Sequence, residues 1–390
     1  MHENLIILGA GATAAISEEG LPIASNFFCS TNRYWDDHRS DYPHLVLACK
    51  KVAILKSQNI SFASLTLTDV WLFIDTLLKY HSATRCNNAY NAMLLRKRYL
   101  AFAEGLPYYL SPEYLNENYN EVCSGFSPLF STLEKQIYHT VPQTDIIPYF
   151  LILAGWELKH LLYKTYDPSN SLINNSLYEN LIDELKDAST SVLNFNYDIF
   201  FEKACMAKGQ KLQLANEDKN TDKDTIYLCK PHGGWNIKHI DHYIEPCCRL
   251  DDHIEDASFD RGMSLEIRPA MIPYFESPDE IKAEHLSVYP GVGKYFFDQQ
   301  ERMKEMFKTV KNVVSVGYSF SEADLHVREI IKKLDKKGEK NLLCILKGAD
   351  PKEDIKNLWG FDNRAEENGQ FQYHDCGFDE KSIRKIIKFL

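Results

Sequence analysis

The chain has 390 residues, with 44 Lys or Arg against 55 Asp or Glu, which gives a formal net charge of −11. A chain of this length can bury a substantial core, and it corresponds to two or three domains or to one large α/β domain with an insertion. The negative charge argues against a broad basic surface that binds nucleic acid through its phosphates. The longest apolar run, residues 146–156, is too short for a bilayer, which needs about 20 residues.

The apolar residues 5–8 predict a buried strand that leads directly into a glycine turn. Gly9 and Gly11 allow a tight turn and a close approach of the backbone to a pyrophosphate, and Ala14 stands at the third position of the G-x-G-x-x-G/A pattern. Amides at the start of the following helix would then face the phosphates. By itself this segment is equally well explained as a tight structural turn.

The residues after this turn do not continue as in a nicotinamide-dependent dehydrogenase. Such an enzyme has a second strand that ends in an acidic residue about 20 positions after the glycines, where it binds the ribose. Asp36 and Asp37 lie near that distance, but the sequence around them has no strand pattern. Instead, the short helix after the turn is expected to end at Gly20, and Pro22 to begin an extended loop. A dehydrogenase is therefore the least favoured function.

Residues 43–185 have helical periodicity and predict a helical module inserted into an α/β domain. Thr66 and Asp69 form a capping box before one of these helices. Further helices are expected at residues 88–104, 128–140, 143–165 with a bend near Pro148, and 175–187. The α/β domain would then consist of residues 1–42 and 186–390.

Asn196 and Asp198 directly follow a strand predicted at residues 191–195, and His232 follows one predicted at 225–229. Ligands of open parallel sheets bind at the carboxyl ends of the strands, so these side chains could share one site. Taken alone, Asp198 is better explained as the N-cap of the next helix and Asn196 as an Asx turn.

Residues 236–300 have no regular pattern, although they are rich in His, Asp and Pro. Cys247 and Cys248 are adjacent and lack the usual spacing of zinc ligands, so no metal site is expected there. The 10 cysteines of the chain include no C-x-x-C pair, and no secretory leader precedes the first strand. We therefore expect reduced thiols and a cytoplasmic location.

Residues 317–319 (Gly-Tyr-Ser) follow another predicted strand, at 313–316. Ser321 and Asp324 then form a capping box for the next helix, which is the favoured explanation of Asp324. The last expected elements are strands at 342–346 and 371–374 and a closing helix at 381–390. Strands that alternate with helices predict an α/β fold with a Rossmann-like, three-layer parallel sheet.

Four motifs each follow a strand, in the order Gly9-Ala10-Gly11, Asn196-Tyr197-Asp198, His232-Gly233 and Gly317-Tyr318-Ser319. This order resembles the sirtuin family, whose G-A-G, Q-N-x-D, H-G and G-T-S segments line one NAD pocket. It is more similar to the SIR2-like proteins of bacterial anti-phage systems, which have T-N-Y-D, H-G and G-Y-S variants. Gly20-Leu21-Pro22 is similar to the family's G-I-P. The resemblance covers residues 5–25 and 190–346 and does not extend to the helical module.

The resemblance implies a sirtuin-like fold and hydrolysis of NAD⁺ to nicotinamide and ADP-ribose, as an effector of anti-phage defence. Asn196 would position the water and the ribose, His232 would act as the general base, and Asp198 would bind the nicotinamide region or orient Asn196. Amides of the glycine turn and the Thr13 hydroxyl would hold the pyrophosphate. The full set of implied NAD⁺ contacts besides the two catalytic residues is Gly9, Ala10, Gly11, Thr13, Pro22, Asp198, Gly317, Tyr318 and Ser319.

Protein deacylases of this family have a four-cysteine zinc module and an acidic-aromatic-arginine run after G-I-P, and this chain has neither. Deacylation is therefore one alternative, and a non-catalytic sensor of NAD⁺ or ADP-ribose is another. Because uncontrolled loss of NAD⁺ harms the cell, the resemblance also implies control by homo-oligomer formation or by a partner, such as a HerA-like ATPase or an Argonaute-like protein. Neither membrane contact nor direct nucleic-acid binding is expected.

Overall fold

The computed structural model divides the chain into two compact units, Met1–Leu21 with Pro168–Leu390, and Pro22–Asp167. The boundaries lie at Leu21 and Asp167, whereas the sequence predicts them at residues 42 and 185. The described residues are 3–17, 21–56, 64–85, 108–124, 146–166, 174–185, 190–214, 225–240, 247–250, 267–271, 290–321, 324–347 and 351–390.

The helices at the two boundaries explain this difference, because each packs inside the unit to which it belongs. Helix α2 (Arg33–His38) packs against α8 (Ile146–Thr165), so the residues before 43 join the helical unit. Helix α9 (Ser176–Leu185) packs against α10 (Phe200–Ala207) and α17 (Glu380–Phe389), so it joins the α/β unit. Neither packing partner can be read from helical periodicity.

The described residues of the unit Pro22–Asp167 contain only helices. The Thr66 capping box is confirmed, since Asp69 N donates to Thr66 Oγ1 at 3.0 Å and Thr66 N donates to Asp69 Oδ2 at 2.9 Å. Pro148 lies in the first turn of α8, where no intrahelical hydrogen bond needs its missing N–H. Besides α2 and α8, the longer helices are α3 (Pro43–Lys56), α4 (Leu67–Arg85) and α6 (Pro112–Ser124). The helices predicted at 88–104 and 128–140 lie outside the described residues.

The α/β unit is built on a seven-stranded parallel sheet of order β10-β9-β8-β1-β2-β4-β3, as in Rossmann-like folds. Its strands are β1 (Asn4–Leu8), β2 (Thr190–Asn194), β3 (Lys211–Leu214), β4 (Thr225–Cys229), β8 (Asn312–Val316), β9 (Asn341–Leu346) and β10 (Phe371–Asp375). All six predicted strands are confirmed as strands of this sheet, which is parallel as predicted. The short strand β3 was not predicted.

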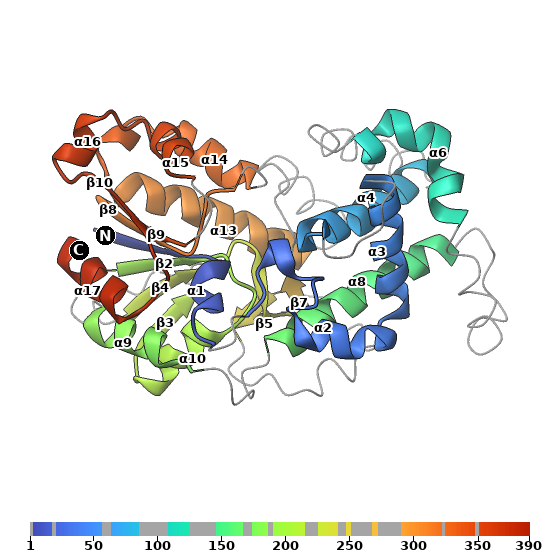
Figure 1. Cartoon of the computed structure of the whole chain (residues 1–390), viewed down its shortest axis with the longest axis horizontal. Helices are drawn as coiled ribbons and strands as arrows, with labels where there is room; N and C mark the ends of the chain where they lie inside the picture. Colours follow the sequence, from blue (N-terminus) through green and yellow to red (C-terminus); the bar gives the residue numbers. More distant parts are fainter. Residues whose placement is uncertain are drawn as a thin grey trace. The chain divides into compact units, whose positions relative to one another are not determined.

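Helices cover both faces of this sheet (Figure 1), with α13 (Pro290–Thr309), α14 (Leu325–Lys332) and α15 (Lys352–Trp359) on one face and α9, α10 and α17 on the other. Alternate residues of β1 point to opposite faces, so Leu5 and Ile7 join the core formed with α13, α14 and α15. Every residue of β1 is buried, which explains its unbroken apolar sequence.

Two parts of the α/β unit differ from the sequence predictions. Residues 236–300, expected to be irregular, contain most of a small antiparallel sheet of order β6-β5-β7 and the first half of α13. The small sheet consists of β5 (Gly233–Ile240), β6 (Cys247–Leu250) and β7 (Ile267–Met271). Helix α1 (Ala10–Ala14) ends well before Gly20, the end that the sequence predicts.

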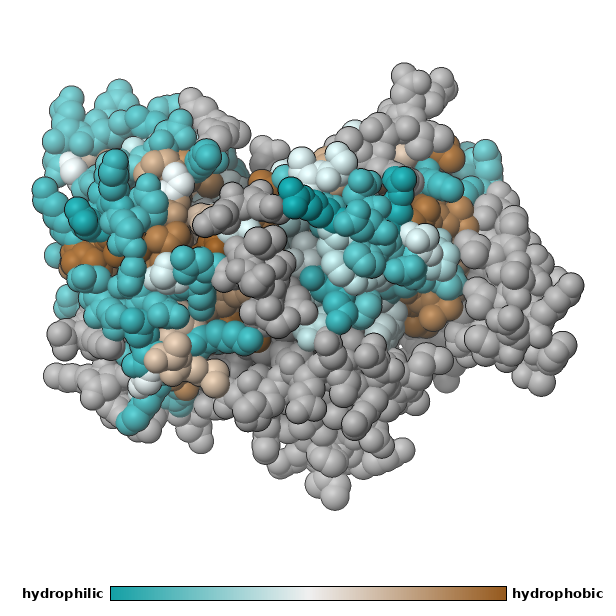
Figure 2. All heavy atoms as spheres, turned by 60° about the horizontal axis from the view of Figure 1, so that its bottom comes forward, coloured by the Kyte–Doolittle hydropathy of each residue, from teal (hydrophilic) through white to brown (hydrophobic). Residues whose placement is uncertain are grey.

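On the face drawn in Figure 2, hydrophilic residues cover most of the described surface, and apolar residues lie between them in small groups. In the part of the chain that the structure describes, the large apolar side chains that are exposed are Ile54, Tyr108, Ile152 and Met206. Among the described residues, no helix combines the length and the apolar character needed to cross a membrane.

Candidate active site

The predicted motifs of the α/β unit meet at one edge of the parallel sheet. From the central strand β1 the chain continues on one side to β2 and later returns on the other side as β8, so the strand order reverses between β1 and β8. Leu8 lies opposite Asn194 and Val316 in the register, so the loops after these three strands begin at the same level. Such a switch point is where open α/β sheets bind ligands.

The glycines of the first and last motifs pack against each other. Gly9 N donates to Val316 O, and Gly11 N donates to Gly317 O, both at 3.0 Å. Gly317 has a φ of +64°, and a Cβ there would lie 2.1 Å from Ala12 N, so only glycine fits this position. The two loops are thereby locked together at the switch point.

This packing corrects the expected role of two glycines. The backbone N–H groups of Gly9 and Gly11 donate their hydrogen bonds to carbonyls within the protein. In this conformation they therefore do not bind a pyrophosphate directly. Ala10 is exposed and is the first residue of α1, a position whose amide has no intrahelical acceptor. The accessible amide of the turn is therefore that of Ala10.

Asn196 is held against the glycine turn by its side-chain amide nitrogen. Nδ2 donates to Gly9 O at 3.1 Å and to Thr13 Oγ1 at 3.0 Å. Thr13 in turn donates to Asp198 Oδ2 at 2.7 Å, so its hydroxyl, expected to bind a phosphate, is used inside the protein. Oδ1 is the atom of Asn196 that could orient a water or a ribose hydroxyl.

The purely local explanations of Asn196 and Asp198 are wrong in detail. The Asx turn belongs to Asn194, whose Oδ1 accepts from Asn196 N at 3.0 Å. The N-cap of α10 is Ile199, and Asp198 precedes it, with Oδ1 accepting from Phe200 N at 3.1 Å. Asp198 thus supports the start of the helix while its other oxygen faces Thr13.

Burial raises the pKa of Asp198 to about 6, and the nearby Lys230 opposes that shift. Lys230 is itself fully buried, and its Nζ donates to Asp198 O at 2.7 Å and to Glu202 Oε1 at 2.6 Å. Neither Lys230 nor Glu202 was predicted as part of the site. Lys230 directly follows β4, a position that could have suggested it.

His232 lies in a tight turn whose sequence, Lys-Pro-His-Gly, explains its shape. Gly233 N donates to Lys230 O at 2.9 Å, and Pro231 fixes the backbone at the second position of the turn. The imidazole is surrounded by rings, with centroid distances of 5.0 Å to Phe195 and 6.1 Å to Tyr197. Burial lowers the pKa of His232 to about 3, although a hydrogen bond with the Phe195 backbone opposes the shift.

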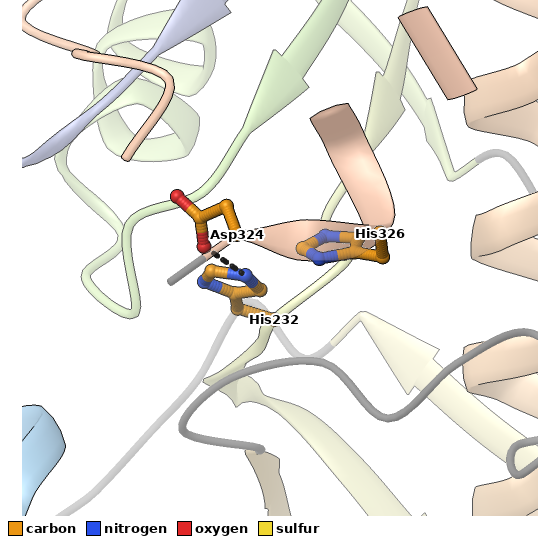
Figure 3. Close-up of side chains that lie close together, drawn as sticks. All are labelled: His232, Asp324 and His326. Carbon is orange, nitrogen blue, oxygen red and sulfur yellow. Dashed lines mark ion pairs between the residues drawn. The ribbon is translucent and has the colours of Figure 1, made fainter. Parts of the chain in front are cut away.

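Asp324 faces His232, which corrects its predicted role as a helix cap. It stands at the N-cap position of α14, but its side chain accepts no capping hydrogen bond. Oδ2 accepts from Tyr318 at 2.8 Å, and Oδ1 lies 3.6 Å from His232 Nε2 (Figure 3). Burial raises the pKa of Asp324 to about 6.

His326, in the first turn of α14, completes this group and was missed in the sequence. Its ring centroid lies 5.6 Å from that of His232, and its side chain is 2% exposed. Burial lowers its pKa well below the ordinary value, and the neighbouring His232 adds to the shift. The signal was the spacing Asp324-x-His326 at the start of a helix that follows a strand.

The remaining predicted residues have different environments. The Tyr318 ring is buried and stacks on Phe195 at 4.4 Å, whereas Ser319 is exposed on the same loop. Phe320 has a φ of +52°, which is unusual for a bulky residue and marks local strain beside the site. Pro22 belongs to the other unit, where its carbonyl accepts from the Tyr166 hydroxyl at 2.6 Å.

No family model matches this chain, and no curated protein matches it either. The fold and the site define its class as an α/β protein with a Rossmann-like parallel sheet. At the switch point of its sheet lies a cluster of histidine, carboxylate and amide side chains, most of which are buried.

Proposed function

We propose that the protein hydrolyses NAD⁺ to nicotinamide and ADP-ribose, with Asn196 and His232 as catalytic residues. The observation that carries the proposal is that the four motifs converge at the switch point of the sheet. Their order in the sequence alone does not require this convergence. Asn196 bonds the glycine turn, His232 packs on Phe195 beside it, and Phe195 stacks on Tyr318. A dinucleotide at the switch point would lie across these loops.

The reaction breaks the bond between the ribose C1′ and the nicotinamide nitrogen. The bonding electrons pass to the nitrogen and neutralise the pyridinium, which leaves an oxocarbenium-like ribose, as in glycoside cleavage. The oxygen of a water then forms a bond to C1′, and the water gives up one proton. The site must therefore orient a water, hold the ribose and accept this proton.

The described side chains can supply these functions. Asn196 Oδ1 orients the water or a ribose hydroxyl, because Nδ2 is fixed on Gly9 and Thr13. Burial keeps His232 in the neutral form that can accept a proton, but it also makes the imidazole a weaker base. The carboxylate of Asp324, 3.6 Å away, would stabilise the imidazolium that forms.

Thr13 and Asp198 act as positioning residues in this scheme. The Thr13 hydroxyl accepts from Asn196 and donates to Asp198, so the pair fixes the direction of the Asn196 amide. This function replaces direct contact of Thr13 with the pyrophosphate. Ala10, Gly317, Tyr318 and Ser319 remain proposed contacts of the nucleotide.

The test is the release of nicotinamide from NAD⁺ by the purified full-length protein. We expect His232→Ala and Asn196→Ala each to lower the rate at least ~100-fold, as the loss of a proton-transfer or orienting group does. His374→Ala and Asn180→Ala are the matched controls, because His374 lies on β10 and Asn180 bonds Glu380 on the surface. Equal activity of all four variants would contradict the assignment.

Binding of NAD⁺ or ADP-ribose without catalysis is the second candidate. The burial of the two proposed catalytic side chains favours this second candidate, since His232 is 7% exposed and Asn196 is 6% exposed. Calorimetry separates the two functions, because a sensor binds NAD⁺ and leaves it intact even when the protein is in its assembled or partner-bound state. Release of nicotinamide that both site variants abolish would exclude the sensor.

A further inference from the structure

His232, Asp324 and His326 place three possible metal-ligand atoms within 4.8 Å of one another. Figure 3 shows the carboxylate of Asp324 directed at the His232 ring, with the His326 ring beside them. The three residues come from two separate elements, the turn between β4 and β5 and the start of α14. Their proximity is therefore a product of the fold and not of one helix face.

The distances fit a small cation with little rearrangement. In a tetrahedral site with metal–ligand bonds of 2.0–2.1 Å, neighbouring ligand atoms lie about 3.4 Å apart. His232 Nε2 and Asp324 Oδ1 are already 3.6 Å apart. Small side-chain rotations of His326 would bring its nitrogen, which lies within 4.8 Å of the other two ligand atoms, to the same spacing.

The residue types indicate which cations would bind. Imidazole nitrogens suit zinc, cobalt, nickel and iron, whereas magnesium and calcium prefer sites made of oxygen atoms alone. Two histidines with one carboxylate leave a coordination position for water or substrate, as in catalytic zinc and non-haem iron sites.

Neighbouring groups hold two of the three side chains in place. The Tyr318 hydroxyl donates to Asp324 Oδ2, which directs Oδ1 toward His232. The His232 ring is hydrogen-bonded to the Phe195 backbone. Metal-ligating carboxylates and imidazoles have supports of this kind, which fix the orientation of the ligand atoms.

We propose that His232, Asp324 and His326 bind one divalent transition-metal ion, for which Zn²⁺ and Co²⁺ are the probes. The test of this site does not depend on the proposed NAD⁺ hydrolysis, because it contains no nucleotide. A bound metal ion would coordinate the imidazole of His232, the same side chain that is assigned to proton transfer. The same residues thus have two alternative uses.

The experiment titrates the metal-free full-length protein with Co²⁺ and follows the visible absorption of the bound ion, and then displaces Co²⁺ with Zn²⁺. We expect one tightly bound equivalent without a thiolate-to-cobalt charge-transfer band, because the ligands are nitrogen and oxygen. Asp324→Asn and His326→Gln should each weaken binding at least ~10-fold, since even the loss of a supporting residue has that effect.

His374→Ala is the matched control, because His374 lies on β10, away from the cluster, and this variant should bind like the wild type. A melting curve without metal checks that each variant folds. As a second measurement, the same concentration of Zn²⁺ should raise the melting temperature of the wild type and of His374→Ala more than that of Asp324→Asn. Absence of wild-type binding, a charge-transfer band from cysteine, or unchanged binding by both cluster variants would overturn the proposal.

Discussion

Gly317 is the residue on which the geometry of the site depends most directly. Its φ of +64° is unfavourable for other residues, and a Cβ would lie 2.1 Å from Ala12 N and 2.5 Å from Gly11 C. Both neighbouring atoms belong to the backbone, so they cannot rotate away. The close approach that the glycine pattern predicts for a bound pyrophosphate is therefore made between two loops of the protein.

We predict that Gly317→Ala lowers the free energy of unfolding by at least ~3 kcal/mol, through backbone strain and steric overlap together. Gly209→Ala is the matched control, because Gly209 has a φ of +65° but a Cβ there would meet no atom within 4 Å. That control should cost only about 1–2 kcal/mol. Urea titration followed by circular dichroism measures both, and equal losses would show that the contact with α1 adds nothing.

Asp198 gives a prediction about pH. Its pKa is raised in the folded state from 3.8 to about 6, so the folded protein binds this proton more tightly than the unfolded chain does. The stability that the proton contributes is present below about pH 4 and is lost as the pH rises through 6. Asn cannot ionise, so its contribution does not change over this range.

Asp198→Asn should therefore gain stability relative to the wild type between pH 4 and pH 7, by up to ~3 kcal/mol for a shift of about two pKa units. Asp354→Asn is a control of opposite sign, because a hydrogen bond from Arg328 lowers the pKa of Asp354. That variant should lose stability relative to the wild type as the pH rises. A difference in the free energy of unfolding between wild type and Asp198→Asn that stays constant from pH 4 to pH 7 would contradict the raised pKa.

The sequence predicts which loops carry the site but not how their side chains are directed. Parallel strands with polar residues after them predict that Asn196 and His232 lie at one edge of the sheet. The direction of Asp324 depends on the exact position of the first turn of α14, and its local pattern favours a helix cap instead. The pair of Lys230 and Glu202 joins residues from different elements, so no local spacing indicates it.

At the scale of elements, the strongest local prediction is the start of α4. Thr66 and Asp69 exchange hydrogen bonds with each other's backbone N–H groups, which satisfies two donors at the end of the helix. A capping box uses only residues three positions apart, and for this reason it can be read from the sequence.

Thr66→Ala should lower the free energy of unfolding of the helical unit by about 1 kcal/mol. Thr84→Ala is the matched control within the same helix, because Thr84 Oγ1 donates to Tyr80 O at 2.8 Å and caps no amide. That substitution should be neutral or slightly stabilising, since alanine has the higher helix propensity. Equal destabilisation by the two variants, measured as the shift in thermal midpoint, would argue against the cap.

The elements that were missed share a physical cause. Helix α13 begins with Pro290-Gly-Val-Gly, whose glycines have low helix propensity, so its start leaves only a weak helical signal in the sequence. Strand β5 pairs with β6 and β7 on either side, and pairing between distant segments leaves a weaker local signal than an apolar run. The continuous apolar strands of the parallel sheet were found because both of their faces are buried.

At the scale of the whole molecule, a protein that hydrolyses NAD⁺ as proposed would have to be kept inactive until it is needed, so we expect control by assembly or by a partner. The second unit, Pro22–Asp167, contributes none of the side chains that form the described cluster. We predict that NAD⁺ hydrolysis requires an assembled state in which this unit makes the contacts.

If assembly is required, mass action makes the specific activity fall as the protein is diluted, because dissociation leaves inactive chains. Light scattering after size-exclusion chromatography gives the oligomeric state at each concentration, and nicotinamide release gives the activity of the same samples. We expect the two to fall together. A monomer whose specific activity is constant on dilution would show that the site is complete in one chain, and control would then have to act on the loops around Asn196 and His232 themselves.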